Sequence, residues 1–564
     1  MIRALVRKLL AIAWFLPGFL LWAAFPPMGE MADALFALAP LMWLSRRAAA
    51  KASAKRWFQS GLFFWGATLA WMPAIVKNGG PWPLVVLGWG ALAAYCALYF
   101  AAYGWLSAKV WAWVRGEDGM AAWRRDRTVA APTGGYWRRL VAILVAEPVL
   151  WCGLELVRSR LGGGFAWNQL GVVPVNAGYG APAALGGVYL CSAVVVLVNG
   201  MIASIVERMW RPDPRWPRPL RSMETILPFL AVWGLYRVSV PKPALSAETM
   251  KVAMVQRNFP CVFRAGEDRE HPWLVYSNLF ETVGHAGCDL VALSESALCE
   301  FGAVDSASAV EFARRARSMT GAKGVLTGGA RRAAGCEYNS AALLTGAGIE
   351  TYDKVHLVPF GEFIPGDKLI PALQRLAPVG SCTAGELKTL DFGGVPVGVA
   401  ICFEDTDSAQ IRRLVELGAR LLVFITNDSW FSHSDEAVQH AWQAVARAVE
   451  TGLPVVRTGN SGVSGVISPD GKATWLVDAD GRPLVDSRGT MVERVALPVP
   501  LGESDSERVR TWYVRLGDRP LACAFALLVG LLVAARVRLA RWRRSLGALA
   551  DIGGEPEVRQ GGEA

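Results

Sequence analysis

Charged residues are scarce in this chain: Asp, Glu, Lys and Arg make up 19% of its 564 residues, whereas hydrophobic residues make up 53%. With so little charge and 24 Trp residues, the chain is too apolar for a purely soluble enzyme, which favours membrane spans. Histidine is also rare, with five residues, and none of the ten cysteines forms a Cys-x-x-Cys pair. Both absences argue against a structural zinc site, and we expect no bound metal.

The positive charge of the chain is unevenly distributed. A net charge of +10 could indicate a nucleic-acid partner, and a length of 564 residues predicts more than one domain. The Lys and Arg residues, however, cluster in loops between apolar segments, which explains the basic composition without nucleic acid. We therefore predict no nucleic-acid partner.

Eight apolar segments are candidates for membrane spans. They cover residues 9–27, 34–45, 57–76, 83–107, 140–157, 183–205, 225–240 and 520–535. The first could instead be a cleaved signal peptide, but the spans that follow it favour a retained span. The second is short, and the fifth is interrupted by Glu147 and Glu155.

The loops between these segments alternate in charge. Loops 3–8, 46–56, 115–139, 208–221 and 536–544 hold 24 Lys and Arg residues, whereas loops 28–33, 76–83 and 160–182 hold 2. Because cytoplasmic loops are enriched in Lys and Arg, this pattern predicts about eight spans with both termini in the cytoplasm. The long insert between the seventh and eighth spans must then face outward.

This insert has a different composition from the rest of the chain. Short β-rich runs, such as 251–256 and 421–426, alternate with helix-like segments at 306–320 and 433–451. This alternation predicts an α/β domain. We expect three parts: a membrane domain of about seven helices (1–240), an outer domain (241–519), and a last span with a basic tail (520–564).

The stretch from Val395 to Asp405 contains the first candidate for a catalytic residue. Its small and β-branched residues predict a buried strand that ends at Cys402. Open α/β folds place their chemistry at such strand ends. A lone buried Cys, however, is more often an inert small hydrophobic residue, so this stretch does not identify a site by itself.

Two further stretches change that interpretation. Residues 289–296 contain another apolar strand, which ends at Glu295, and Lys354 lies in the patterned stretch 352–365. This order of Glu, Lys and Cys after strand-like segments resembles the nitrilase superfamily, whose triad is Glu-Lys-Cys. The Lys354 stretch and the upstream motifs closely resemble the apolipoprotein N-acyltransferase family, over almost the whole chain.

The membrane half carries part of this resemblance. Trp151, Glu155 and Arg158 precede a Gly-Phe-x-Trp-x3-Gly segment at 164–171, as in that family. Glu155 and Arg158 lie one helical turn apart and can pair, either as a buried ion pair or near a lipid head group. The resemblance implies a nitrilase-like α-β-β-α sandwich inserted in a polytopic α-helical membrane domain, with no cofactor.

The resemblance also assigns roles within the triad. A thiol with its ordinary pKa near 8.5 is mostly protonated at neutral pH, so Cys402 needs help to act as a nucleophile. Glu295 would be the general base, and Lys354 would stabilise the oxyanion and favour the thiolate. Taken singly, Glu295 or Lys354 could equally be a solvated surface group.

Other positions match the outer half of the family. Glu362 and Glu404 match acids near the triad, and Phe403 stands where the family usually has Tyr, so any role of that hydroxyl is in doubt. Asn427 opens an Asn-Asp-x-Trp-Phe segment whose Trp430 and Phe431 could form a lipid-facing gate, although two aromatic residues are more often core. The match continues at Gln256, Asn258, Gln439, His440, Arg447, Arg457, Asn460 and Gly462.

Two cysteine hypotheses are weaker. A papain-type Cys402–His440 pair is disfavoured because His440 already has a family counterpart in a helix-like segment. An oxidising compartment could pair some of the remaining outer-domain cysteines, which are Cys261, Cys288, Cys299, Cys336 and Cys382. Cys402 must stay free to react.

The resemblance implies an acyltransferase of the bacterial inner membrane. Cys402 would take an acyl chain from a phospholipid and pass it, through a thioester, to the α-amino group of a diacylglyceryl-cysteine on a lipoprotein. The bilayer, the phospholipid donor and the lipoprotein acceptor are the expected partners, and the outer domain would face the periplasm. Two alternatives are a membrane-tethered nitrilase-type amidohydrolase and a transporter with an appended binding domain.

Overall fold

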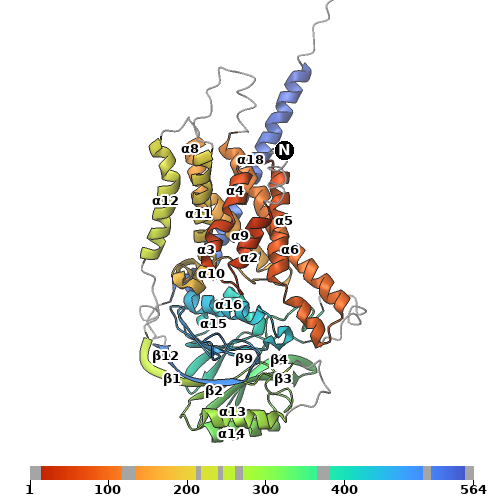
Figure 1. Ribbon diagram of the computed structural model, residues 1–564, viewed down its shortest axis with the longest axis vertical. Coiled ribbons are helices and arrows are strands. Elements are labelled where there is room, and N and C mark those ends of the chain that lie inside the picture. The colour runs from red at the N-terminus through yellow and green to blue at the C-terminus, as the bar shows by residue number, and fades with distance from the viewer. Residues whose placement is uncertain are drawn as a thin grey trace, which may run out of the picture.

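The computed structural model describes residues 14–116, 135–210, 218–238, 245–260, 271–364, 382–499 and 510–552. They form two parts stacked along the long axis of the molecule, a helical bundle and an α/β sandwich (Figure 1). The chain builds most of the bundle first, then the sandwich, and returns to the bundle with its last helix.

The bundle consists of short and long helices. They are α2 (Phe15–Ala23), α3 (Met31–Ala37), α4 (Ala39–Ser45), α5 (Ala50–Thr68), η1 (Met72–Asn78), α6 (Trp82–Val114), α8 (Gly135–Val141), η2 (Ala142–Ala146), α9 (Glu147–Arg158), η3 (Leu161–Gly163), α10 (Val172–Pro174), η4 (Val175–Tyr179), α11 (Ala183–Trp210), α12 (Arg218–Arg237) and α18 (Arg519–Ile552).

Four helices among the described residues are long and apolar enough to cross a membrane. They cover Trp82–Val114, Gly135–Arg158, Ala183–Trp210 and Arg519–Arg538. The other predicted spans form shorter or more polar helices: α2 has 9 residues, and α3 and α4 are separate 7-residue helices. The bundle therefore has several apolar helices, and the predicted count of eight spans is not confirmed.

Aromatic rings hold the long helices together. Trp57 on α5 packs against Tyr103 on α6, with ring centroids 4.7 Å apart, and against Trp151 on α9 at 6.1 Å. Such pairs add about 0.5–1.5 kcal/mol each beyond the burial of their area. Gly104 makes this approach possible, because a side-chain carbon there would lie 2.3 Å from the Trp57 ring.

The sandwich contains two six-stranded sheets of mixed direction. In spatial order, the first is β12 (Gly489–Pro498), β1 (Leu245–Gln256), β2 (Leu290–Leu293), β3 (Gly324–Ala333), β4 (Cys336–Thr345) and β5 (Ile349–Asp353). The second is β11 (Ala473–Trp475), β10 (Gly465–Ile467), β9 (Val455–Gly459), β8 (Leu421–Thr426), β7 (Val395–Ile401) and β6 (Thr389–Phe392).

Helices cover the outer face of each sheet. The first sheet carries α13 (Pro272–Val283) and α14 (Ala307–Thr320), and the second carries α15 (Ser408–Glu416) and α16 (Glu436–Thr451). Alternating apolar residues such as Val397, Val399 and Ile401 point between the sheets and are fully buried. The predicted nitrilase-like α-β-β-α sandwich is therefore confirmed.

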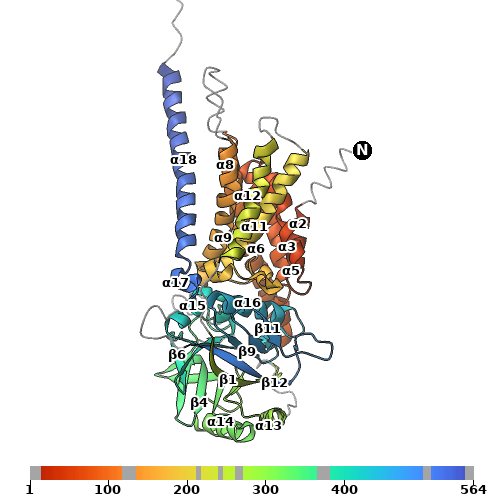
Figure 2. The same ribbon diagram turned by 90° about the vertical axis from the view of Figure 1, so that its left-hand side faces the viewer.

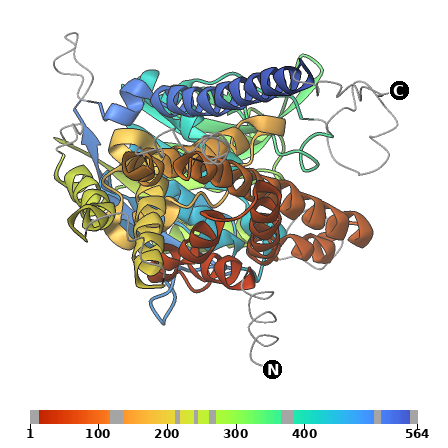
Figure 3. The same cartoon turned by 90° about the horizontal axis from the view of Figure 1, so that it is seen from above.

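The sandwich meets the bundle through its second sheet. Helices α15 and α16 lie directly beneath the bundle, whereas α13 and α14 lie at the far end of the molecule (Figures 1 and 2). After the short α17 (Trp512–Leu516), α18 runs along one side of the bundle, and α12 lies at another edge (Figures 2 and 3). This arrangement places the strand ends of the second sheet close to the apolar helices.

Candidate active site

The predicted triad residues follow the ends of strands from both sheets. Glu295 comes two residues after β2, Lys354 directly after β5, and Cys402 directly after β7. Cys402 has a backbone φ of 54°, and Ser296, next to Glu295, has a φ of 61°. Both angles lie in the left-handed region, which is strained for non-glycine residues and is concentrated at functional sites.

The structure brings three predicted side chains into one buried cluster. Lys354 Nζ lies 3.8 Å from Glu295 Oε1 and 2.9 Å from Glu362 Oε1. Asn339 Nδ2 donates to both carboxylates, at 2.7 Å to Glu295 and 2.6 Å to Glu362. Asn339 was missed in the sequence, because only the pairing of β4 with β5 places it there.

Burial and neighbouring charges set the protonation of this cluster. Burial alone would lower the pKa of Lys354, but Glu362 and Glu295 raise it well above its ordinary value. Burial raises the pKa of Glu295, whereas Lys354 holds the pKa of Glu362 below its ordinary value. Glu295 is therefore the stronger base of the two carboxylates.

The Cys402 thiol is neutral at rest. Burial raises its pKa well above the ordinary value, and Glu295 raises it further. Lys354 acts in the predicted direction and favours the thiolate, but burial and Glu295 outweigh it. The site therefore fits a thiol that loses its proton to Glu295 as it reacts, rather than a preformed thiolate.

Glu404 joins the strand ends of the two sheets. Its carboxylate accepts hydrogen bonds from Tyr352 Oη (3.0 Å to each oxygen), Val355 N (2.7 Å), His356 N (3.0 Å) and Ile401 N (2.8 Å). Glu404 is fully buried. It thereby fixes the backbone around Lys354 against the backbone that leads into Cys402.

Phe403 packs toward the bundle. Its ring lies 6.1 Å from Phe165 and 6.5 Å from Trp167, nearly parallel to both, and 5.5 Å from the ring of His356. Phe165 and Trp167 belong to the segment that the sequence singled out before α11. The aromatic ring at position 403 therefore connects the strand end that carries Cys402 to the bundle.

The segment after β8 is clamped to η1 of the bundle. Within the segment, Asn427 Oδ1 accepts a hydrogen bond from Ser429 Oγ at 2.6 Å. Toward the bundle, Asn78 Nδ2 donates to the Trp430 carbonyl at 2.7 Å, and the Phe431 ring centroid lies 4.6 Å from that of Trp71. These contacts place Trp430 and Phe431 at the junction of the two halves. A lipid-facing gate at these two residues stays a prediction.

A buried charge network lies behind this segment. His440 Nδ1 is 2.9 Å from Asp428 Oδ1, and His440 Nε2 is 3.0 Å from Asp405 Oδ1. Arg457 pairs with the same two carboxylates, at 2.6 Å to Asp405 and 3.3 Å to Asp428. Burial alone would lower the pKa of His440, but Asp405 and Asp428 raise it to about 10.

This network argues against a papain-type pair. Both ring nitrogens of His440 face carboxylates, so His440 is held as an imidazolium between Asp405 and Asp428. Burial raises the pKa of the neighbouring Glu436 well above its ordinary value, which leaves it neutral. His440 and Arg457 then balance the two Asp charges, and His440 has no free nitrogen to act as a base.

Gln439 on α16 connects the sandwich to three segments of the bundle. Its side-chain oxygen accepts from Trp71 Nε1 (3.3 Å), Trp167 Nε1 (3.0 Å) and Asn168 Nδ2 (3.1 Å), and its amide donates to the carbonyls of Pro26 (3.2 Å) and Thr68 (3.3 Å). Nearby, His356 Nε2 lies 2.7 Å from the carbonyl of Gly163. The two halves therefore share specific polar contacts around the site.

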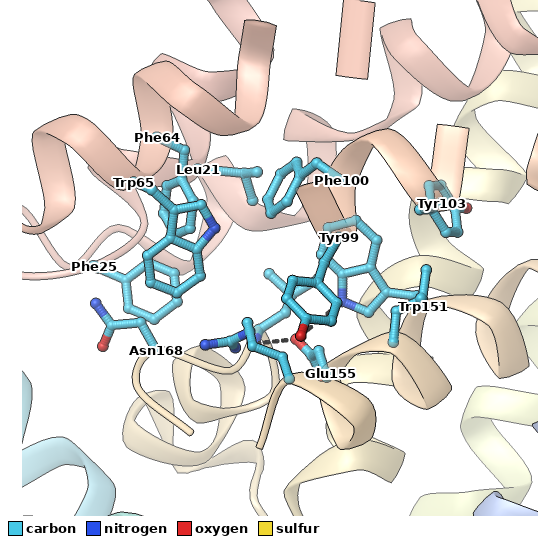
Figure 4. Close-up of a pocket in the computed structure, with 13 residues that line it drawn as sticks. Leu21, Phe25, Phe64, Trp65, Tyr99, Phe100, Tyr103, Trp151, Glu155 and Asn168 are labelled. Atoms are coloured by element: carbon cyan, nitrogen blue, oxygen red, sulfur yellow. Dashed lines mark hydrogen bonds between the residues drawn. The ribbon is translucent and has the colours of Figure 1, made fainter. Parts of the chain in front are cut away.

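Glu155 and Arg158 hold the loop before α11. Glu155 Oε1 accepts from Leu170 N at 2.8 Å, and Arg158 donates to the carbonyls of Phe165 at 2.7 Å and Trp167 at 2.8 Å. Within the described residues, both side chains bind this loop, and no ion pair joins the two; a role near a lipid head group stays a prediction. Both also line an aromatic pocket in the bundle, with about 430 Å³ of empty volume including its mouth (Figure 4).

Two family profiles and a solved structure are similar to parts of this chain. A family profile described as "Apolipoprotein N-acyltransferase N-terminal domain" matches residues 17–201, and one described as "Carbon-nitrogen hydrolase" matches residues 251–497. Among solved structures, an amidase variant from Nesterenkonia sp. AN1 covers 50% of this chain and 97% of its own, with 17% identity and a TM-score of 0.34.

Curated relatives match nearly the whole length. An apolipoprotein N-acyltransferase from Geobacter metallireducens is 30% identical over 547 residues, which cover 93% of this chain and 94% of the relative. One from Photobacterium profundum is 28% identical over 83% of this chain and 86% of its own. With both halves matched in one continuous alignment, this chain belongs to the apolipoprotein N-acyltransferase family.

Proposed function

We propose that this protein moves an acyl chain from a membrane phospholipid to the N-terminal α-amino group of a diacylglyceryl-cysteine on a lipoprotein. The observation that carries this proposal is the buried Lys354, within 3.8 Å of Glu295 and 2.9 Å of Glu362, beside a neutral Cys402 at the junction with apolar helices. Both substrates are anchored in lipid, so a reactive thiol next to the bundle can reach both.

In the first half-reaction, Glu295 takes the proton of Cys402 while the sulfur attacks the ester carbonyl of the phospholipid. Lys354 stabilises the oxyanion of the tetrahedral intermediate. The C–O bond then breaks, the lyso-phospholipid leaves with the proton from Glu295, and the chain stays on Cys402 as a thioester.

In the second half-reaction, the α-amino group of the lipoprotein attacks the thioester. Glu295 accepts a proton from the amine and returns it to the Cys402 sulfur as the C–S bond breaks. The products are an amide on the lipoprotein and the free thiol. Glu362 keeps Lys354 charged through both steps, and Glu404 keeps the two strand ends aligned.

The experiment that tests this proposal is detection of the acyl-enzyme. Protein incubated with phospholipid alone should gain one acyl mass on the peptide that contains Cys402, and neutral hydroxylamine should release it. Cys402→Ala should abolish this adduct, whereas Cys382→Ala should leave it in place. An adduct that survives Cys402→Ala would contradict the proposal, and rapid release to water without acceptor would favour an amidohydrolase.

We also propose an orientation in the bacterial inner membrane. Residues 1–240 and 520–564 would form the membrane part with about eight spans and cytoplasmic termini, and residues 241–519 would face the periplasm. The loop count of 24 Lys and Arg residues against 2 supports this. A reporter that works only outside the cytoplasm should be active when fused at Ser246 and inactive at Arg218; the opposite pattern would reverse the orientation.

A further inference from the structure

A groove lies at the foot of α18, where the chain passes from the sandwich to its last helix. Residues of α9, α15, α17 and α18 line it, and its empty volume is about 650 Å³ including its mouth. Figure 2 shows α17 beside α15 at the base of α18. The lining carries three arginines and one acid, which are Arg160, Arg412, Arg519 and Asp518. None of the described residues that line the groove belongs to the triad.

The groove lies at the level expected for lipid head groups. Arg519 is the first residue of a helix that is long and apolar enough to cross a membrane. The short α17 that precedes it exposes Trp512, and the Arg515 guanidinium lies over that ring at 5.2 Å. Trp and long basic side chains are typical of the membrane–water interface. Beyond the groove, α18 exposes apolar side chains such as Leu527, against which acyl chains can pack.

Arg412 brings an unused pair of donors to this groove. Its Nη1 donates to Glu416 and, at 3.2 Å, to the carbonyl of Val514, whereas its Nε and Nη2 have no partner among the described residues. These two N–H groups form the edge of a guanidinium that binds an anion through two parallel hydrogen bonds. Arg139 uses the same edge on Glu224, with Nε at 2.7 Å and Nη2 at 3.0 Å. Arg412 is therefore ready for a carboxylate or a phosphate.

The charges of the groove favour an anionic head group. Arg519 has no hydrogen bond or ion pair among the described residues, so its charge is not balanced there. The nearby carboxylates are already bound, Asp518 by Arg160 at 2.7 Å and Glu416 by Arg412. A phosphate thus meets two available guanidinium groups. The ammonium group of a zwitterionic lipid meets no carboxylate without an arginine partner.

We propose that this groove binds an anionic phospholipid that is not the acyl donor. The phosphodiester accepts hydrogen bonds from Nε and Nη2 of Arg412 and from Arg519, and the acyl chains enter the bilayer along α18. Cys402 packs against the core between the two sheets, whereas Arg412 lies on α15, on the outer face of the second sheet. The groove and the thiol are thus on opposite sides of that sheet. The proposal rests on the membrane placement of α18 proposed above.

A lipid in this groove joins the two halves of the protein. Arg412 belongs to the sandwich and Arg519 to the last helix, so one phosphate bridges them. Elsewhere α18 packs closely on α9, where a side-chain carbon at Gly153 would lie 2.1 Å from the Phe525 ring, but its apolar stretch is not buried inside the molecule. Because a ligand that binds only the folded state stabilises it, the lipid should raise the thermal midpoint.

The test titrates phosphatidylglycerol into the full chain, delipidated in detergent. Bound lipid is counted by native mass spectrometry, and the thermal midpoint is measured in parallel. Arg412→Gln should weaken binding about 10- to 100-fold, because it removes a charged pair of donors. Arg412→Lys keeps the charge but loses the paired donors and should weaken binding about tenfold. Ala522→Trp, at an exposed position of the groove, fills it without changing its charge and should abolish the stabilisation by lipid.

Arg413 provides the matched control. Its Nη1 lies 3.6 Å from Glu416, but it is not among the described residues that line the groove. Arg413→Gln should therefore bind phosphatidylglycerol like the unmodified protein. Phosphatidylcholine, which has the same phosphate but a cationic head, should bind more weakly. Glycerol 3-phosphate, which has no acyl chains, should not stabilise the protein at the same concentrations.

Three results would overturn the inference. In the first, Arg412→Gln and Ala522→Trp bind phosphatidylglycerol like the unmodified protein, or Arg413→Gln weakens binding as much as they do. In the second, phosphatidylcholine binds as well as phosphatidylglycerol. In the third, Arg412→Gln loses the acyl adduct on Cys402 together with the bound lipid, which would make the groove the donor site. Failure of the proposed function looks different: the acyl adduct would lie on a residue other than Cys402, whatever the lipid titration shows.

Discussion

The two sheets of the sandwich differ in what covers their outer faces. Helices α13 and α14 close the first sheet with a separate apolar core, which includes Tyr276, Phe280 and Phe312. Over the second sheet, the apolar core runs without a break from Phe424 on β8 through Ala444 on α16 into the bundle. The helices on the first sheet thus form a core of their own with that sheet. The helices on the second sheet share their apolar core with the bundle.

The proposed triad takes its members from both of these unequal sheets. Glu295 and Lys354 follow strands of the first sheet, and Cys402 follows a strand of the second. Their relative position therefore depends on contacts between the sheets, such as those of Glu404, and on contacts that hold the second sheet to the bundle, such as those of Gln439. One sheet therefore positions the proposed base and cation, and the sheet tied to the bundle positions the proposed nucleophile.

The largest effect should come from the charges of the first sheet. Glu295→Gln removes the base and should lower acyl transfer about 10²–10⁴-fold, and Lys354→Met removes the oxyanion partner and should lower it about 10²–10³-fold. Transfer is measured with a lipoprotein peptide acceptor. Lys323→Met, at a mostly exposed lysine of the same domain, is the control and should keep full activity. Normal turnover in Glu295→Gln or Lys354→Met would remove that residue from the triad.

A smaller effect should follow when the link between the sheets is weakened. Glu404→Gln keeps the side-chain shape but cannot accept from all its donors, so buried N–H groups near Lys354 and Cys402 lose partners. The free energy of unfolding should fall by about 1–3 kcal/mol. Acyl-enzyme formation should slow about tenfold, because displacing reacting groups slightly costs rate. Unchanged stability and rate would mean that the sheets are aligned without Glu404.

A still smaller effect on acyl transfer should follow when the contacts between the second sheet and the bundle are weakened. Gln439→Ala leaves Trp71, Trp167 and Asn168 without their acceptor, which should cost about 1–3 kcal/mol of stability and slow acyl transfer severalfold. The counterpart on the far sheet is Glu311→Ala on α14, which breaks only exposed ion pairs and should leave the thermal midpoint unchanged. If the two substitutions had equal effects, the second sheet would depend on the bundle no more than the first sheet does.

The last effect concerns the pH dependence of stability rather than the rate of acyl transfer. His440 has a pKa raised from 6.5 to about 10 in the folded protein. A raised pKa stabilises the fold fully below pH 6.5, and that contribution is lost as pH rises through about 10. The thermal midpoint should therefore decline between pH 7 and pH 10, and His440→Asn should flatten this slope. A slope that His440→Asn leaves intact would assign the decline to another group.

The sequence predicts those residues of the candidate site that directly follow a predicted strand. Cys402 and Glu295 each follow an apolar run, Lys354 lies in a patterned stretch, and the resemblance to a known family joins the three into one candidate site. Asn339 gives no such signal, because its position beside Glu295 and Glu362 depends on which strands become neighbours. Strand pairing joins residues far apart in the chain, and no local pattern encodes it.

The bundle is predicted less completely than the sandwich. Glu155 and Arg158 are singled out correctly, but helical spacing suggests that they pair, and their contacts to the loop at 162–171 appear only in the folded chain. The contact of Gln439 with Asn168 joins positions 271 residues apart. Hydropathy finds the four long apolar helices, whereas short helices such as α3 and α4 depend on their neighbours for burial.

The unbroken core between the bundle and the second sheet has a consequence for biogenesis. The ribosome makes most of the bundle before the strands of that sheet, so the outer layer of α15 and α16 finds its apolar partners already in place (Figure 1). A chain cut free of its bundle would expose this layer to water and should aggregate. If Cys402 acts as proposed, folding of the strand end that carries it is thereby linked to assembly of the bundle.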